Sequence, residues 1–167
     1  MKSDKEEFLE ILTAYQGILF KVGLVYFRNE NDRQDNFQEI VYQLWKAFPG
    51  LRNRSSLGSW IYAVSINTSI SRLRSNRKIE YRESVPDLPD SYSISGNYER
   101  EESLRLLLEA IYQLDELNKS IMLLYLEERS YAEIAEILGI SASNVGARIN
   151  RAKDQLKQFL NRENNGK

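Results

Sequence analysis

The 167-residue sequence contains no cysteine and no histidine. Without cysteine the chain has no disulfide bonds and no thiolate metal sites. Without histidine it lacks the commonest general base and the commonest metal ligand of enzymes. Any catalysis would therefore rest on carboxylates, lysine, tyrosine or serine, and we expect neither a metal ion nor a cofactor.

Long hydrophobic runs are also absent. The longest apolar stretch, residues 18–27, contains Lys21 and falls short of the roughly 20 residues that span a bilayer. Residues 1–12 are acidic and lack the basic-then-apolar layout of a signal peptide. These features predict no membrane insertion and a cytoplasmic location.

Positive and negative charges nearly balance overall, but the positive charges are concentrated in two segments. The net charge is −1, yet residues 52–82 hold seven Arg or Lys and one acid. Residues 83–102 hold six acids and one Arg, and residues 143–162 hold five Arg or Lys and one acid. This order predicts two nucleic-acid surfaces separated by an anionic segment.

Apolar residues recur at helical spacing along most of the chain, and no stretch has the alternation of a strand. The first expected helix buries Phe8, Leu12, Tyr15, Leu19, Val22 and Tyr26, and the second buries Phe37, Ile40, Val41, Leu44, Trp45 and Phe48. A polar turn over residues 29–32 separates them, and a third helix starts near Ser56. Residues 80–97 contain Pro86, Pro89 and Gly96 and allow no helical period. We therefore predict an all-α chain with a three-helix domain over residues 1–79, an acidic linker over 80–99 and a second helical domain over 100–167.

Residues 130–150, SYAEIAEILGISASNVGARIN, have the pattern of a helix-turn-helix. Ser130 and Glu133 are spaced as a capping box, Gly139 suits a left-handed turn and Ser141 can cap a second helix. The expected buried positions are Tyr131, Ile134, Ala135 and Leu138, then Val145, Ile149, Ala152 and Leu156. The opposite face of the second helix is short or cationic and suits a DNA groove. Two amphipathic helices of an ordinary bundle would explain each cue taken singly.

Residues 114–160 resemble region 4 of the extracytoplasmic-function sigma factors, and the core SYAEIAEILGIS carries the likeness. The first domain resembles region 2 of the same family. Residues 32–40, DRQDNFQEI, are similar to its D-x-x-D-x-x-Q-E segment, with Trp45 at the usual aromatic position. Residues 55–62, SSLGSWIY, followed by Asn67, resemble its S-x-L/F-x-T-W-L-Y…N segment. Both likenesses occur in the family's order and cover nearly the whole chain.

The resemblance implies a sigma factor, which is not an enzyme but directs bacterial core RNA polymerase to promoter DNA. In the family, region 2 docks on the clamp helices of the polymerase β′ subunit, and the β flap is a second contact. The docking residues implied here are Asp32, Asp35, Gln38 and Glu39. The spacing of Asp35, Gln38 and Glu39 would also suit a solvated helix face. Many members are restrained by an anti-sigma factor, which we expect as a further partner.

The resemblance also implies which residues contact the promoter. Those for the −10 element are Arg52, Asn53, Arg54, Trp60, Asn67, Arg72 and Arg74, although Trp60 is expected to be chiefly a core residue. Those for the −35 element are Ser143, Asn144, Gly146, Ala147, Arg148, Asn150 and Arg151. The chain departs from the family at Gly146, where many members carry Lys or Arg, and at Asp115, where proline is common.

Three other functions fit parts of the sequence. A stand-alone regulator would bind duplex DNA as a dimer through the helix-turn-helix, but this leaves the first domain without a role. A hydrolase could hold Mg²⁺ with Asp32, Asp35 and Glu39, although the chain has no phosphate-binding loop. A sigma-like decoy would bind polymerase without starting transcription.

Overall fold

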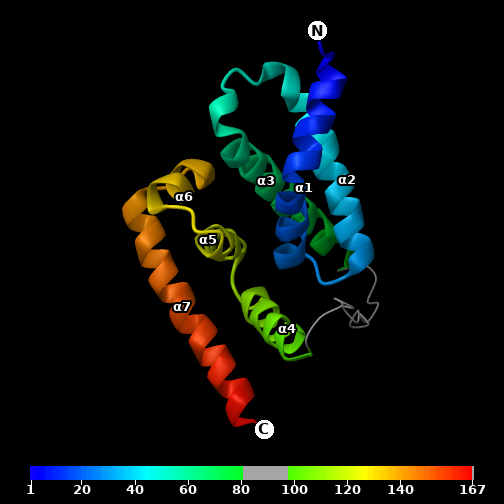
Figure 1. The fold of residues 1–167 in the computed structure, drawn as a ribbon. Helices are drawn as coiled ribbons and strands as arrows, with labels where there is room; N and C mark the ends of the chain where they lie inside the picture. The colour runs from blue at the N-terminus through cyan, green and yellow to red at the C-terminus, as the bar shows by residue number, and fades with distance from the viewer. Residues whose placement is uncertain (81–97, 167) are drawn as a thin grey trace. The chain divides into compact units, whose positions relative to one another are not determined.

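A computed structural model describes residues 1–80 and 98–166 of the chain. Within these residues the fold is all-α, as predicted, and contains no strand. The elements are α1 (Asp4–Tyr26), α2 (Glu30–Ala47), the 3-10 turns η1 (Phe48–Gly50) and η2 (Arg54–Ser56), α3 (Leu57–Glu80), α4 (Tyr98–Tyr112), α5 (Glu116–Leu126), α6 (Tyr131–Leu138) and α7 (Ala142–Asn165) (Figure 1).

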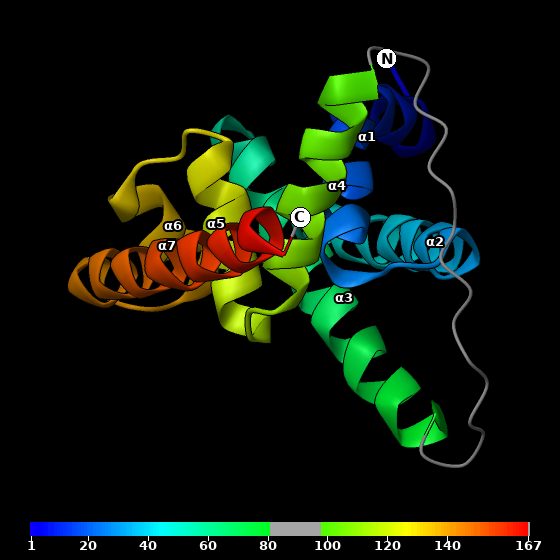
Figure 2. The ribbon, with the colours of Figure 1, turned by 90° about the horizontal axis from the view of Figure 1, so that it is seen from below.

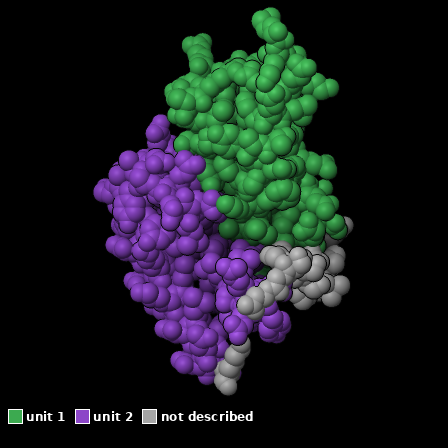
Figure 3. All heavy atoms as spheres, in the orientation of Figure 1, with its two compact units in different colours: residues 1–89 green, residues 90–167 purple. Residues whose placement is uncertain are grey.

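The chain divides into two compact units, residues 1–89 and residues 90–167 (Figure 3). The first unit contains α1 to α3, which pack on one another, and the second contains α4 to α7. The predicted linker, residues 80–99, lies outside the described residues except at its two ends, which are helical. The domain boundaries proposed from the sequence stay predictions.

Helix α1 begins at a capping box that the sequence analysis did not single out. The backbone N–H of Glu6 donates to Oγ of Ser3 at 3.2 Å, and the backbone N–H of Ser3 donates to Oε2 of Glu6 at 2.9 Å. These bonds satisfy amide groups that the first helical turn leaves without partners. The predicted apolar stripe is buried at Phe8, Leu19 and, further along, Val22 and Tyr26.

By length and composition, α1 could also cross a membrane, because one 18-residue window within it contains at most two charged residues. The sequence prediction did not include this possibility, because Lys21 interrupts the apolar stretch of residues 18–27. Helices that form the core of a globular unit pass the same test. Here α1 packs against both α2 and α3, so its apolar face has a partner within the unit.

Helix α2 begins at Glu30, three residues earlier than the polar turn predicted over residues 29–32 allows. The reason is Asn29, whose Oδ1 accepts the backbone N–H of Asn31 at 2.7 Å and caps the helix. At the other end of α2, the ring of Phe8 meets Trp45 at 5.0 Å and Phe48 at 5.5 Å between centroids. Trp45 nevertheless stays 42% exposed, so only one side of its ring belongs to the core.

A buried polar contact joins α2 to α3. Nδ2 of Asn36 donates to Oγ of Ser69 at 2.9 Å, and Oγ of Ser69 donates to the carbonyl oxygen of Ser65 at 2.7 Å. All three residues are fully buried. This contact is not predictable from the sequence, because Asn36 lies within a polar stretch that resembles an exposed helix face.

The second unit contains the predicted helix-turn-helix, formed by α6 and α7 (Figure 2). Gly139 adopts the expected left-handed conformation, with φ of 69°, and Ser130 and Ser141 cap the two helices through the backbone N–H groups of Glu133 and Asn144. The predicted stripe of α7 is fully confirmed: Val145, Ile149, Ala152 and Leu156 are all buried.

Along α6 the prediction is confirmed only in part, because Ala135 and Leu138 are half-buried. Ile134 is buried, but Tyr131 is 43% exposed because its ring packs beside Gly146 of α7 instead of entering the core.

Candidate nucleic-acid interfaces

Helix α7 has one face in the core and the other exposed. Ala147, Asn150 and Arg151 are exposed, whereas the intervening Ile149 is buried. The exposed residues are one or three to four positions apart, so they share one face of the helix. A major groove of B-DNA admits a helix of this kind, and its base edges offer partners to arginine and asparagine side chains.

Other side chains at the start of α7 are already engaged within the unit. Arg148 is half-buried, and its Nη1 donates to Oδ1 of Asn118 in α5 at 3.2 Å. Its Nε donates to Oδ1 of Asn144 at 3.2 Å. Oγ of Ser143 lies 3.2 Å from Oγ of Ser141. Of the predicted −35 residues, Gly146 and Arg148 thus contact other elements of the second unit, and Ser143 and Asn144 have contacts within α7 and its cap, unlike the freely exposed Arg151.

Two charged groups next to the helix-turn-helix have altered acidity. The hydrogen bond from Arg129, followed by that from Ser130, lowers the pKa of Glu133 at the start of α6. A hydrogen bond with Tyr125 raises the pKa of Lys153, whose Nζ lies 4.4 Å from the centre of the Tyr125 ring. Both effects favour the charged forms, so the start of α6 keeps its anion and α7 keeps its cation.

In the first unit, the loop between η1 and α3 presents three predicted −10 residues, all exposed. Asn53 caps η2, because its Oδ1 accepts the backbone N–H of Ser55 at 3.0 Å. Arg54 forms an ion pair with Glu7 of α1, and its guanidinium lies 5.4 Å from the centre of the Phe48 ring. Arg52 is also exposed on this loop, and it takes part in none of these contacts. Trp60 is half-buried against the core, as expected.

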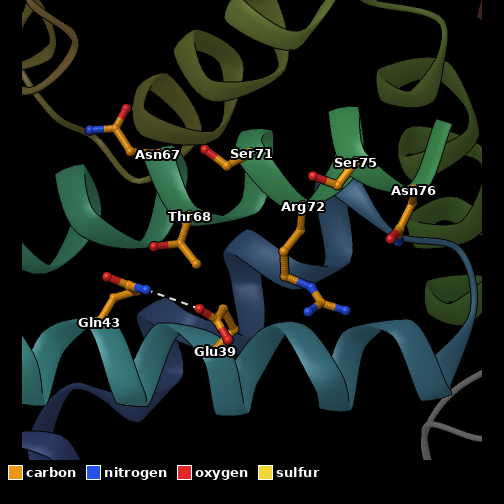
Figure 4. A pocket seen from close by; sticks show the side chains of 8 residues that line it. All are labelled: Glu39, Gln43, Asn67, Thr68, Ser71, Arg72, Ser75 and Asn76. Carbon is orange, nitrogen blue, oxygen red and sulfur yellow. Dashed lines mark hydrogen bonds between the residues drawn. The ribbon is translucent and has the colours of Figure 1, made fainter. Parts of the chain in front are cut away.

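Figure 4 shows a polar groove of about 550 Å³ between α2 and α3. Thr68 and Arg72 point from α3 toward α2, and Glu39 and Gln43 point from α2 toward α3. Nε2 of Gln43 donates to Oε1 of Glu39 at 3.0 Å. Nε of Arg72 is buried and lacks a hydrogen-bond partner among the described residues. The lining of the groove therefore contains a guanidinium and a carboxylate, and one guanidinium nitrogen is buried without a described partner.

The groove brings together residues that were predicted for two different partners. Glu39 was predicted to bind polymerase, whereas Asn67 and Arg72 were predicted to bind the −10 element, and all three line the groove. Asn67 is exposed and lies on the side of α3 that faces away from α2. Sequence reasoning missed the remaining lining residues, which are Gln43, Thr68, Ser71, Ser75 and Asn76.

The predicted docking residues of α2 do not share one environment. Asp35 and Gln38 are exposed, whereas Asp32 and Glu39 are half-buried. In residues 1–80 and 98–166, no three carboxylate side chains are arranged to hold a metal ion. The magnesium site considered for Asp32, Asp35 and Glu39 therefore has no geometric support in this part of the chain.

Comparison with known proteins gives two family matches. "Sigma-70 region 2" matches residues 11–79, and "Sigma-70, region 4" matches residues 104–156. The RNA polymerase sigma factor SigV of Bacillus subtilis is 28% identical over 153 residues, which are 91% of this chain and 90% of that protein. The sigma factor YlaC of the same organism is 31% identical over 137 residues, 76% of each chain.

A solved structure has the same fold. It is the sigma factor RpoE of Bartonella quintana in complex with the anti-sigma factor NepR. The TM-score is 0.71, with 18% sequence identity over 94% of this chain and 96% of that one.

Proposed function

The chain belongs to the sigma-70 family of RNA polymerase sigma factors, within the extracytoplasmic-function group, and we propose how its two units divide the work of promoter recognition. The first unit docks on core polymerase and captures the −10 element, and the second unit reads the −35 element. The observation that carries this assignment is the capped helix-turn-helix, whose second helix exposes Ala147, Asn150 and Arg151.

In the first unit, we assign polymerase docking to Asp32, Asp35, Gln38 and Glu39 of α2. The exposed Asp35 and Gln38 are available to a basic or amide-rich partner helix. We assign −10 recognition to Arg52, Asn53, Arg54, Trp60, Asn67, Arg72 and Arg74. Arg52 and Asn67 are supported by their exposure, whereas Trp60 serves mainly to anchor α3 in the core.

The need for polymerase follows from the size of the energies. Opening about ten base-pair steps costs on the order of 14 kcal/mol, at about 1.4 kcal/mol per step. Capturing two or three unpaired bases returns roughly 2–9 kcal/mol, at about 1–3 kcal/mol each. A net charge of −1 adds little general attraction to DNA. Contacts with polymerase must therefore supply the rest of the free energy of opening. Because bacterial polymerase works in the cytoplasm, we propose the same location for this chain.

A further partner is suggested by a solved relative. The RpoE structure of Bartonella quintana contains an anti-sigma factor. We propose that an anti-sigma factor also restrains this chain by covering polymerase-binding or DNA-binding surfaces.

Run-off transcription with bacterial core polymerase and a promoter-rich genomic library tests the proposed function. Discrete starts that share spaced −35 and −10 elements, and that depend on the chain, are the expected result. Polymerase binding without new starts would indicate a decoy. Tight binding to a symmetric duplex site without polymerase would indicate a stand-alone regulator. Either of these two outcomes would overturn the assignment.

A further inference from the structure

Four polar side chains form a continuous series of hydrogen bonds from the cap of α5 to the first turns of α7. Oδ1 of Asp115 accepts the backbone N–H of Asn118 at 2.8 Å, and Oδ2 accepts Nδ2 of Asn118 at 3.3 Å. Oδ1 of Asn118 accepts Nη1 of Arg148 at 3.2 Å. Nε of Arg148 then donates to Oδ1 of Asn144 at 3.2 Å. This series links one end of α5 to the DNA-facing end of α7.

The chemistry of the groups fixes which way each amide points. An ionised carboxylate only accepts hydrogen bonds, and a guanidinium only donates them. Asn118 therefore turns Nδ2 toward Asp115 and Oδ1 toward Arg148. Asn144 likewise turns Oδ1 toward Arg148, which leaves its Nδ2 as the polar atom for an outside partner. Nδ2 of Asn144 has no hydrogen bond of this series, so Asn144 is oriented chiefly as a hydrogen-bond donor toward an outside partner.

This orientation matters because asparagine usually recognises adenine through both atoms of its amide, donating to N7 and accepting from N6. One of the two lone pairs of Oδ1 already accepts from Arg148, so a two-point contact with adenine would require Oδ1 to accept two hydrogen bonds at once. A donor alone suits an edge made of acceptors, such as N7 and O6 of guanine or O4 of thymine. Arg148 is half-buried and has two of its nitrogens already bonded within the unit.

We propose that Asn144 is a specificity-determining residue that reads an acceptor-bearing base edge of the −35 element, and that Arg148 is the positioning residue that holds it in this state. The inference rests on the proposed function, in which α7 enters the major groove. In this proposal Arg148 does not contact a base itself but positions Asn144. Asp115 and Asn118 in turn position Arg148 through their hydrogen bonds.

The sharpest variant is Asn144→Asp. It keeps an oxygen for Nε of Arg148 but replaces the outward donor by an acceptor of nearly the same shape. The full chain and core polymerase are assayed on promoters with a randomised −35 element. We expect the preference for guanine or thymine at one base pair to fall on the order of tenfold. Lys157→Ala, which removes an exposed positive charge further along α7, is the matched control and should leave base preference unchanged.

A second pair of variants tests the positioning role. Arg148→Lys keeps the charge but has a single nitrogen, which cannot reproduce the two-armed contact with Asn118 and Asn144. Because the Asn144 amide is then released, the preference at the same base pair should shift toward adenine. In an Asn144→Ala background, Arg148→Lys should have no further effect at that base pair. Circular dichroism shows whether each variant is folded. If Arg148→Lys does not fold, the result for Asn144→Asp alone decides the inference.

Several outcomes would overturn the inference while leaving the proposed function intact. One is that Asn144→Asp leaves the base preference unchanged. Another is that Arg148→Lys changes the preference at a different base pair. A third is that Arg148→Lys and Asn144→Ala have additive effects on the preference. Failure of the unmodified chain to direct any discrete start would instead overturn the proposed function itself. The two failures are therefore distinguishable in one set of assays.

Discussion

The ring of Tyr131 lies against the backbone of Gly146: a Cβ at position 146 would stand 3.4 Å from Cε2 and 3.7 Å from Cδ2 of the ring. This contact accounts for the exposed position of Tyr131 at the start of α6. From the family resemblance, Lys or Arg is expected at the position of Gly146. In this chain an aromatic ring from the neighbouring helix occupies the space that such a side chain would need to cross.

Gly146→Ala should stabilise the second unit by about 0.5–1 kcal/mol, because glycine inside a helix costs about 1 kcal/mol relative to alanine. The added methyl group meets the ring at a van der Waals distance, so little of this gain is lost. Urea unfolding of the full chain measures the change. Gly139→Ala is the control of opposite sign. It should destabilise by about 1–2 kcal/mol, because φ at this residue is 69°. Destabilisation by Gly146→Ala would mean that the ring cannot yield.

The fold was largely predictable from spacing and caps. The stripe Val145, Ile149, Ala152 and Leu156 is buried at every position, because a period of 3.6 residues directly reports one helix face. The environments of Tyr131 and Asn36 were not predictable in the same way. Each depends on a residue far along the sequence, Gly146 or Ser69, and the pattern of a single helix contains no information about such a neighbour.

The contact between Arg54 and Glu7 gives a second prediction. A double-mutant cycle with Arg54→Ala and Glu7→Ala should yield a coupling of about 0.2–1 kcal/mol, the usual range for exposed ion pairs. The coupling should fall as salt is added, because both groups are accessible to solvent. Urea unfolding at low and high ionic strength measures it. A coupling that does not change with salt would show that packing on the Phe48 ring dominates instead.

Acid should weaken the cap of α6. The pKa of Glu133 is lower in the folded chain than its ordinary value of 4.5, chiefly because of Arg129. The unfolded chain therefore takes up the proton first. The contribution of Glu133 is fully present above about pH 4.5 and is lost as the pH falls through the lower folded pKa. Urea unfolding of Glu133→Gln and the unmodified chain should diverge above that pH and converge below it. Parallel curves would contradict the assignment.

Asn67→Ala should weaken recognition of the −10 element by about 1–3 kcal/mol if the side chain contacts a base. Because Asn67 is exposed, its loss should not disturb the core or the binding of polymerase. Promoter opening and polymerase affinity are measured side by side. Ser71→Ala, on the same side of the same helix, is the control. Loss of both activities in Asn67→Ala would show that the residue is structural.

Arg151→Ala should weaken binding to the −35 element by about 1–3 kcal/mol and relax its sequence preference. Arg151 is exposed on the face of α7 that we assign to DNA. Promoter occupancy by the polymerase complex measures the loss. Arg162→Ala removes an equal charge near the end of the helix and should have a smaller, sequence-independent effect. Equal losses in the two variants would indicate that only the charge of Arg151 matters.

The candidate site was only partly predictable. The family motifs indicated which stretches face DNA or polymerase, and exposed residues such as Arg151 and Asp35 fit that assignment. Motifs did not indicate which of those side chains are already engaged. Arg148 and Arg54 are as cationic as Arg151, yet one is hydrogen-bonded to two asparagines and the other is paired with Glu7. Charge and periodicity do not distinguish these cases, because Asn118 and Glu7 come from other helices.

The buried hydrogen bond between Asn36 and Ser69 determines how far α2 can slide along α3. A shift of one helical turn would leave Nδ2 of Asn36 buried without its partner, at a cost of about 1–3 kcal/mol, in addition to Oδ1, which already has no partner among the described residues. The bond thus selects one register of the two helices more than it adds stability. Because Asp35 lies beside Asn36 on α2 and Asn67 lies two residues before Ser69 on α3, this register also sets the spacing between the surface assigned to polymerase and the surface assigned to promoter DNA.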